Sequence, residues 1–154
     1  MELNDVVLLR GALQWALMDP EGRVIKSQLI KNTVVTAGRA FVLKQLQTVN
    51  YDTTKTISHL EIGSGTIAPT TADTALGGAV TRKAISSFDT TNLAANPPSW
   101  QAQISFATNE GNTTLGEAGL FNTSSGGTML ARATFTSFVK ATSNTLAISY
   151  TISA

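Results

Sequence analysis

Hydrophobic and polar residues alternate with a period of two along most of the chain, which predicts extended strands with one buried face. In residues 100–106, Trp100, Ala102, Ile104 and Phe106 alternate with Gln and Ser. This pattern is typical of an antiparallel strand with one face packed and the other in water. We expect further strands in residues 57–62, 80–88, 115–121, 129–135 and 146–152.

Residues 6–31 predict a β-hairpin at the start of the chain. Its turn is Asp19-Pro20-Glu21-Gly22, in which proline presets φ at the second position and glycine tolerates positive φ at the fourth. Alternate residues of the first strand are then expected to share one buried face: Leu9, Gly11, Leu13, Trp15 and Leu17.

One segment departs from the strand pattern and predicts an amphipathic helix over about residues 37–48. The hydroxyl of Thr36 is suited to cap its first turn. We expect this helix to lie on the edge or end of the sheets. The residues at helical spacing that indicate it are Arg39, Val42, Leu43, Leu46 and Val49.

Short strands separated by Gly- and Asn-rich turns predict a mainly β fold, an antiparallel β-sandwich of about eight strands with this one helix. A chain of 154 residues favours a single domain, with the remaining strands in residues 57–153. Residues 63–78 and 89–98 show little periodicity. We expect these loops and the N-terminal residues to contact partners rather than to build the core.

Composition argues against several classes of partner and of functional site. Charged residues form 14% of the chain, against about 25% in average domains, and the net charge is +1. A basic stripe for phosphates is missing, so nucleic acid is not expected as a partner. The chain contains no cysteine, which excludes disulfides, thiolate zinc sites and a cysteine nucleophile. An acidic start at Met1–Asp5 and short apolar runs predict synthesis in the cytoplasm without membrane attachment.

Several turn and strand segments coincide with a known family. They are residues 62–66 (IGSGT), 73–76 (DTAL), 80–84 (VTRKA), 116–122 (GEAGLFN), 126–135 (GGTMLARATF) and 146–152 (LAISYTI). Together they resemble small virion proteins of tailed phages, which are described as structural, decoration or tail proteins. The resemblance implies a virion protein without catalytic residues, metal or cofactor. Its implied partners are other virion proteins (the major capsid protein, or tail or neck proteins) and further copies of itself.

The residues that could carry catalysis are few. His59 is the sole histidine of the sequence and would share a strand face with Glu61, as a base oriented by a carboxylate would. We favour a half-exposed strand histidine. Ser64 lies between Gly63 and Gly65, but the helix of a nucleophile elbow and the lysine of a phosphate loop are missing. We therefore expect these glycines to form a turn that leaves the sheet.

Glu117 lies in a predicted strand of small residues, and we expect it to pair with Arg132 or Arg82 rather than to catalyse a reaction. A glycosidase would need two facing carboxyl groups, which distant residues could supply. The carboxylates do not follow the spacing of a calcium loop. Trp15 and Trp100 are expected in the core, whereas a carbohydrate-binding platform would expose such rings.

The Asn-x-Ser/Thr patterns at Asn112 and Asn122 are interpreted as accidental. The sequence thus predicts a non-enzymatic structural protein of the virion, with capsid decoration as the leading version. The alternatives are a tail, collar or fibre-attachment protein, a carbohydrate- or receptor-binding module, and an enzyme that uses His59 or paired acids.

Overall fold

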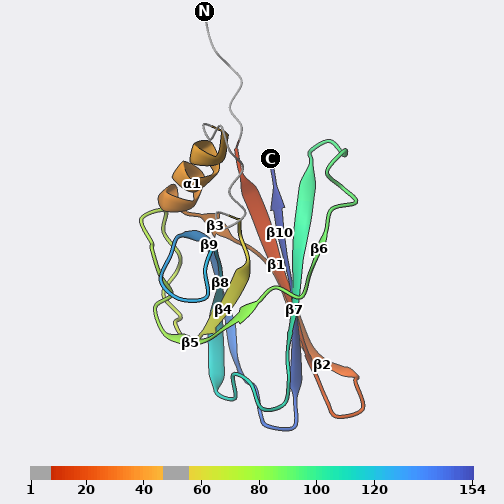
Figure 1. Ribbon diagram of the computed structural model, residues 1–154. Helices are drawn as coiled ribbons and strands as arrows, with labels where there is room; N and C mark the ends of the chain where they lie inside the picture. Colours follow the sequence, from red (N-terminus) through yellow and green to blue (C-terminus); the bar gives the residue numbers. More distant parts are fainter. Residues whose placement is uncertain (1–7, 47–55) are drawn as a thin grey trace, which may run out of the picture.

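The computed structural model describes residues 8–46 and 56–154, in which two antiparallel five-stranded sheets pack together (Figure 1). The first sheet has the order β2-β1-β10-β7-β6, formed by Val24–Lys31, Arg10–Met18, Thr145–Ser153, Ser99–Phe106 and Ser87–Asp89. The second has the order β3-β9-β8-β4-β5, formed by Thr33–Val34, Met129–Val139, Thr114–Phe121, His59–Gly63 and Ala79–Ala84. The predicted mainly β sandwich is confirmed.

The N-terminal hairpin is present as β1 and β2, which pair antiparallel. Gly22 has a φ of 79° and its N–H donates to Asp19 O over 3.0 Å, so the turn has the predicted geometry. Residues 6 and 7 of the predicted hairpin lie outside the described residues. β1 also pairs with β10, which places the first and last described strands side by side.

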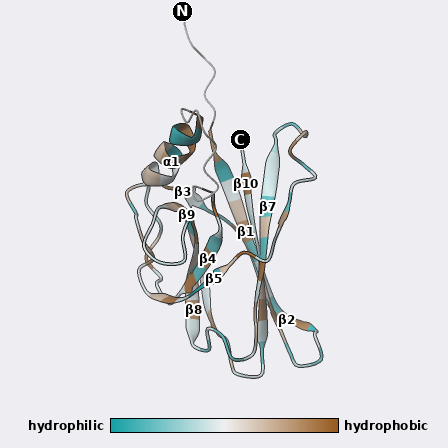
Figure 2. Cartoon of the chain, viewed as in Figure 1, coloured by the Kyte–Doolittle hydropathy of each residue, from teal (hydrophilic) through white to brown (hydrophobic). Residues whose placement is uncertain are grey.

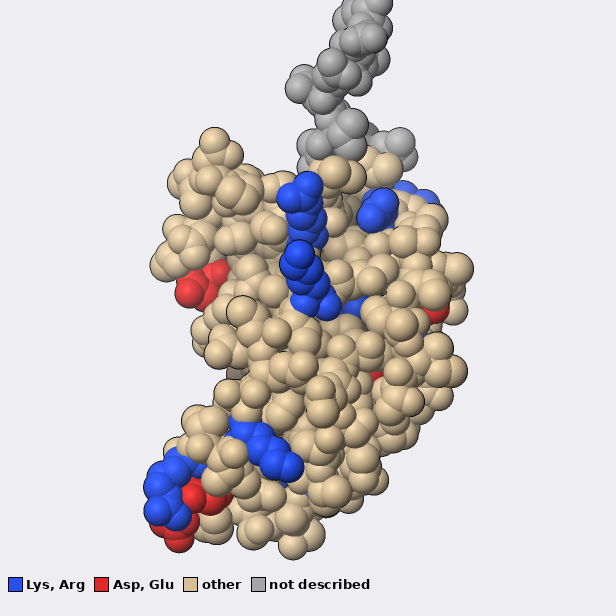
Figure 3. Space-filling view, turned by 180° about the vertical axis from the view of Figure 1, so that it is seen from behind, with Lys and Arg blue, Asp and Glu red and all other residues tan. Residues whose placement is uncertain are grey.

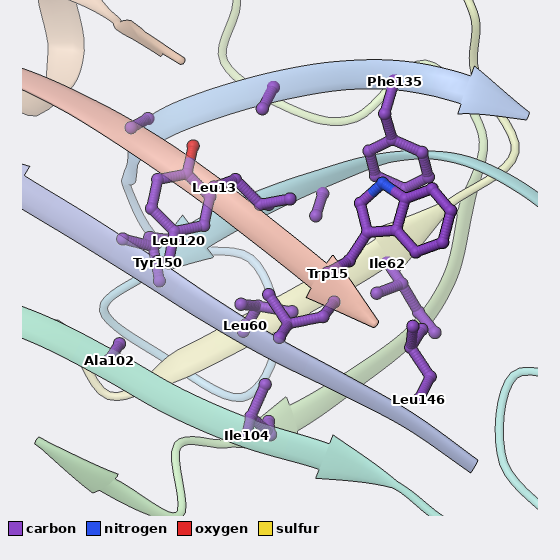
Figure 4. Close-up of a cluster of buried hydrophobic side chains, with 14 of the residues drawn as sticks. Leu13, Trp15, Leu60, Ile62, Ala102, Ile104, Leu120, Phe135, Leu146 and Tyr150 are labelled. Atoms are coloured by element: carbon purple, nitrogen blue, oxygen red, sulfur yellow. The ribbon is translucent and has the colours of Figure 1, made fainter. Parts of the chain in front are cut away.

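The core lies between the two sheets and is filled by alternate residues of the strands, including Leu13, Trp15 and Leu17 as predicted. Figure 4 shows core side chains from both sheets meeting, among them Leu13 and Trp15 of the first sheet and Leu120 of the second. In Figure 2, hydrophobic and hydrophilic segments are interleaved within each sheet. At one end of the core, the ring of Trp15 stacks on Phe138 with a centroid distance of 4.1 Å. The period-two pattern therefore identifies the inner faces correctly.

The prediction of one strand over residues 80–88 is wrong, because this segment forms β5 in one sheet and β6 in the other. Between them the chain crosses the sandwich: Ile85 N–H donates to Ser58 O and Ser86 N–H donates to Gln103 O, each over 2.9 Å. Ile85 packs against the core during the crossing. The core-facing positions change from odd to even numbers here, because Thr81 and Lys83 lie opposite Ile62 and Leu60, whereas Phe88 lies opposite Ala102. This division and the two-residue β3 raise the strand count to ten in the described residues, above the predicted eight or so.

Helix α1 spans Thr36–Leu46 and lies at one end of the second sheet, as expected (Figure 1). It begins at Thr36 itself, and residues 47–49 lie outside the described range. Of the residues at helical spacing, Val42 packs against the core, whereas Leu43 and Leu46 are 61% and 79% exposed. Gly38 is buried against β9 instead, where a Cβ atom would clash with the carbonyl oxygen of Leu130. This close backbone approach sets the rotation of the helix.

Residues 64–78 cover the outer face of the second sheet, which is the side turned away from the core. Leu76 from this loop is buried with Val35, Phe121 and Met129 in a second hydrophobic cluster. The core between the sheets contains no residue of this loop, in line with the expectation, and the loop buries Leu76 in a separate cluster on the outer face. No helix in residues 8–46 or 56–154 has both the length and the apolar character needed to cross a bilayer.

Candidate functional site

The most polar buried site of the described residues is centred on Glu117, whose side chain is 0% exposed. Its Oε1 accepts hydrogen bonds from the N–H groups of Gly65 and Gly78 over 2.9 and 2.7 Å, and its Oε2 accepts one from Gly77 N–H over 3.1 Å. A Cβ atom at Gly65 or Gly63 would collide with this carboxylate. The glycines predicted to form a turn therefore have a second role, which is to let the loop backbone approach Glu117.

Arg132 joins the same site from β9. Its Nε and Nη2 lie 2.8 and 2.7 Å from Glu117 Oε2, and its Nη1 lies 2.6 Å from Asp73 Oδ2. Nη2 also donates to Ile67 O over 3.1 Å. One guanidinium group thus links a strand carboxylate to a loop carboxylate and a loop carbonyl. The predicted pairing of Glu117 with Arg132 is confirmed, and the arrangement fastens residues 64–78 onto the sheet.

The electrostatics of this site keep both carboxylates charged. Burial acts to raise the pKa of Glu117, but hydrogen bonds from Gly77 and Gly78 and the Arg132 guanidinium more than offset it, so the pKa lies below its ordinary value. Hydrogen bonds from Thr70, together with Arg132, lower the pKa of Asp73. Two facing carboxyls work as acid and base when their pKa values are pushed apart, whereas here both move down. The geometry therefore supports a structural role, in which Glu117 and Arg132 hold residues 64–78 on the sheet.

A second ion pair lies on the same outer face. Arg82 Nη2 is 3.1 Å from Glu61 Oε2, and Arg82 Nη1 donates to the carbonyls of Thr123 and Gly126 over 3.2 and 2.8 Å. Its guanidinium carbon lies 3.6 Å from the ring centroid of Phe121, a cation–π geometry. Arg82 therefore pairs with Glu61 rather than Glu117, and it ties the turn between β8 and β9 to β5.

His59 is half-buried in β4, as the favoured interpretation predicted. Its ring nitrogen Nδ1 lies 2.8 Å from the hydroxyl of Ser58. Burial, and then the nearby positive charge of Arg82, lower the pKa of His59 below 6.5. Glu61 is engaged by Arg82, so the acid expected to orient this imidazole is held by another partner. Ser64 is exposed and its hydroxyl donates to Gly78 O over 3.4 Å.

The remaining sequence candidates fall in turns or at edges. Asn112 donates to Thr108 O over 2.6 Å, and Asn122 accepts from Thr128 N–H over 2.7 Å. Within the part of the chain that the structure describes, no group of three or more His, Asp or Glu side chains is placed to hold a metal ion.

The outer face of the first sheet has a different character. Strand register shows which residues share it, because paired residues point to the same side. Over most of its area this face carries only uncharged side chains: Ala12, Gln14, Ala16, Met18, Val24, Ser27, Leu29, Ser87, Gln101, Gln103, Ser105, Thr145, Ala147, Ser149 and Thr151. Among its paired positions, charges occur only in the two rows nearest the start of β1, at Arg10, Lys31 and Asp89. We call this surface the uncharged face.

An aromatic pocket of about 480 Å³ lies between α1 and the β6–β7 edge, lined in part by Phe41, Phe88 and Trp100. Phe88 is 45% exposed, and its ring meets the Trp100 ring edge-on with a centroid distance of 5.6 Å. Trp100 is half-buried and packs against the core, so the prediction of a core position holds only in part. The neighbouring strand β6 has only three residues and pairs with Gln101–Gln103 of β7. The first residues of β7, including Trp100, therefore have no paired partner in β6.

No protein-family model matches the chain, and searches of the curated proteins and of the solved structures give no significant match.

Proposed function

We propose that the chain is a non-enzymatic structural protein that binds repeated protein surfaces on a larger particle, as a decoration protein does on the head of a tailed phage. The resemblance of the turn and strand motifs to those of tailed-phage virion proteins supports the choice of a phage virion as this particle. The proposal includes residence in the virion, major capsid protein as partner and self-association into a homo-oligomer. A tail, collar or fibre-attachment protein is the alternative location within the same class.

The uncharged face is the single observation that carries this proposal. Burying a charge in an interface costs free energy unless a partner compensates it, and interface cores are depleted of charged residues. A sheet face whose side chains are mostly uncharged can be covered by another protein with little such cost. Its central row, Gln14–Ser149–Gln103, crosses three strands without a charge. High copy number would multiply the modest free energy of each contact.

The location and stoichiometry of the chain on purified particles test the proposal. Cryo-electron microscopy is expected to show the chain at repeated lattice sites on the capsid, with the uncharged face buried against its partner. Density confined to a neck or tail ring would select the alternative location. A chain that co-purifies with no particle would contradict the proposed class.

A substitution on the uncharged face tests the surface itself. Gln14 is exposed in β1, so Gln14→Arg is expected to leave folding intact and to abolish or strongly weaken particle binding. Ser124 is exposed in the turn between β8 and β9, so Ser124→Arg adds the same charge elsewhere and serves as the control. Equal binding by both variants would exclude the uncharged face as the interface.

The aromatic pocket favours a second candidate, a carbohydrate- or receptor-binding module. Concave sites with aromatic walls and a few polar groups are typical of small-ligand binding, and Gln45 and Thr90 line this pocket beside Phe88 and Trp100. Glycan-array binding by the purified chain, lost in a Trp100→Ala variant and retained in Gln14→Arg, would support this candidate over the first.

A further inference from the structure

A second pocket, of about 640 Å³, lies where β1 begins, at the end of the uncharged face. Three cations from three different elements line it: Arg10 from β1, Lys31 from β2 and Arg39 from α1. Three residues that carry hydroxyl groups, Thr33, Thr151 and Ser153, line it as well. No carboxylate belongs to the described lining. We call this site the cationic pocket.

The three cations of the cationic pocket lack a counter-charge among the described residues. Within residues 8–46 and 56–154, no carboxylate lies within ion-pair distance of Arg10, Lys31 or Arg39. Elsewhere the protein neutralises such groups: Arg23 pairs with Asp19 over 2.7 Å. In Figure 3, Lys and Arg side chains gather in the upper part of the molecule with no acidic side chain between them.

The hydroxyl groups add donors suited to an anion. Thr151 Oγ1 accepts a hydrogen bond from Gln101 Nε2 over 3.2 Å, which leaves its own proton free to be donated. Arginine guanidinium groups present parallel N–H donors that match the two oxygens of a carboxylate. Because the cations line a concave site, their fields overlap and attract negative charge more strongly than an isolated surface cation does.

We propose that the cationic pocket binds the carboxylates of an acidic segment of the partner protein. The inference rests on the proposed function, since it assigns chemistry to the partner that covers the uncharged face. Ala12 and Thr151 belong both to this face and to the lining of the pocket, so a protein lying on the face would place a segment over the cations. The uncharged face then supplies contact area, while the pocket fixes the orientation of the partner through charge.

Isothermal titration calorimetry of the full chain with a capped hexaglutamate peptide, at low ionic strength, tests this proposal. Saturable binding is expected, weakened as salt is added. The double variant Arg10→Gln, Arg39→Gln is expected to bind the peptide about tenfold more weakly, because two charge-assisted contacts are lost. Lys26→Gln and Arg23→Gln remove exposed cations outside the pocket and are expected to bind like the wild type. Thermal melting verifies that every variant is folded.

Two further titrations test whether the pocket binds peptide carboxylates or a free small anion. Inorganic phosphate and citrate are titrated in the same way, and weak binding that the peptide displaces is expected. Tight binding of phosphate with none of the peptide would overturn the proposal in favour of a small-anion site, and equal peptide binding by the double variant would overturn the location. If the peptide fails while Gln14→Arg still blocks attachment to particles, this inference is lost and the proposed function stands.

Discussion

Glu117 and Arg132 form a diagonal ion pair on the outer face of the second sheet, although neither lies directly opposite the other. In the register of β8 and β9, Glu117 lies opposite Thr134 and Arg132 lies opposite Gly119. Both side chains are almost completely buried, at 0% and 4% exposure, beneath residues 64–78. The pair therefore works as a fastening between sheet and loop, with Asp73 as its third member.

Glu117→Gln is expected to destabilise the protein by about 3 kcal/mol, because it leaves the buried Arg132 charge partly uncompensated. The amide would also present N–H groups where the loop N–H groups need an acceptor. Urea unfolding followed by tryptophan fluorescence measures the loss. Glu21→Gln, in an exposed pair with Arg23, is the matched control and is expected to change the free energy of unfolding by less than about 0.5 kcal/mol. Similar losses in both variants would contradict the fastening role.

Gly38→Ala is expected to destabilise the protein by about 2 kcal/mol, opposite to the effect of alanine in a free helix. Alanine is favoured over glycine by about 1 kcal/mol inside helices. At Gly38, however, a Cβ would clash with the backbone of Leu130, and forcing α1 away from β9 costs more than the propensity gains. Thermal unfolding checks the sign. Ala40→Gly, at an exposed position of the same helix, is expected to lose only the propensity difference.

Stability is expected to fall with acidification below about pH 4.5. Asp73 and Glu117 have ordinary pKa values of 3.8 and 4.5, and both are lowered in the folded protein. A carboxyl group with a lowered folded pKa stabilises the fold above its unfolded pKa, and this contribution disappears as pH falls through the folded pKa. Unfolding free energies measured from pH 7 to 3 test the sign. The Glu117→Gln variant is expected to show a shallower decline, and an identical decline would contradict the assignment.

His59 is expected to titrate below pH 6.5, because its burial and the positive charge of Arg82 disfavour the imidazolium form. As the sole histidine of the sequence, it gives an unambiguous ring-proton signal in NMR. Arg82→Gln is expected to raise the midpoint, since the charge is removed while burial remains. Arg23→Gln, far along the chain in an exposed turn, is expected to leave the midpoint unchanged. A wild-type midpoint above 6.5 would contradict the predicted environment.

Several features of the Glu117 site could be predicted from the sequence, because they follow from the local pattern of residues. Glu117 among small strand residues predicted a structural ion pair, and Arg132 was one of two partners considered. The sequence did not predict that Gly65 and Gly78 hold the same carboxylate, because they lie 52 and 39 residues from it. The signal was present as glycines flanking an aperiodic loop, but nothing local says what they approach.

The period-two rhythm by itself determined the mainly β class, the hairpin and the inner faces of the strands, because side-chain direction in a strand depends only on residue parity. It could not determine that residues 80–88 change sheets, because that change depends on pairing with distant residues, of β5 with β4 and of β6 with β7. Nor could it determine the rotation of α1, which a backbone contact at Gly38 decides. The tertiary structure alone brings Arg10, Lys31 and Arg39 into one pocket, because they belong to three elements that meet only when both sheets are assembled.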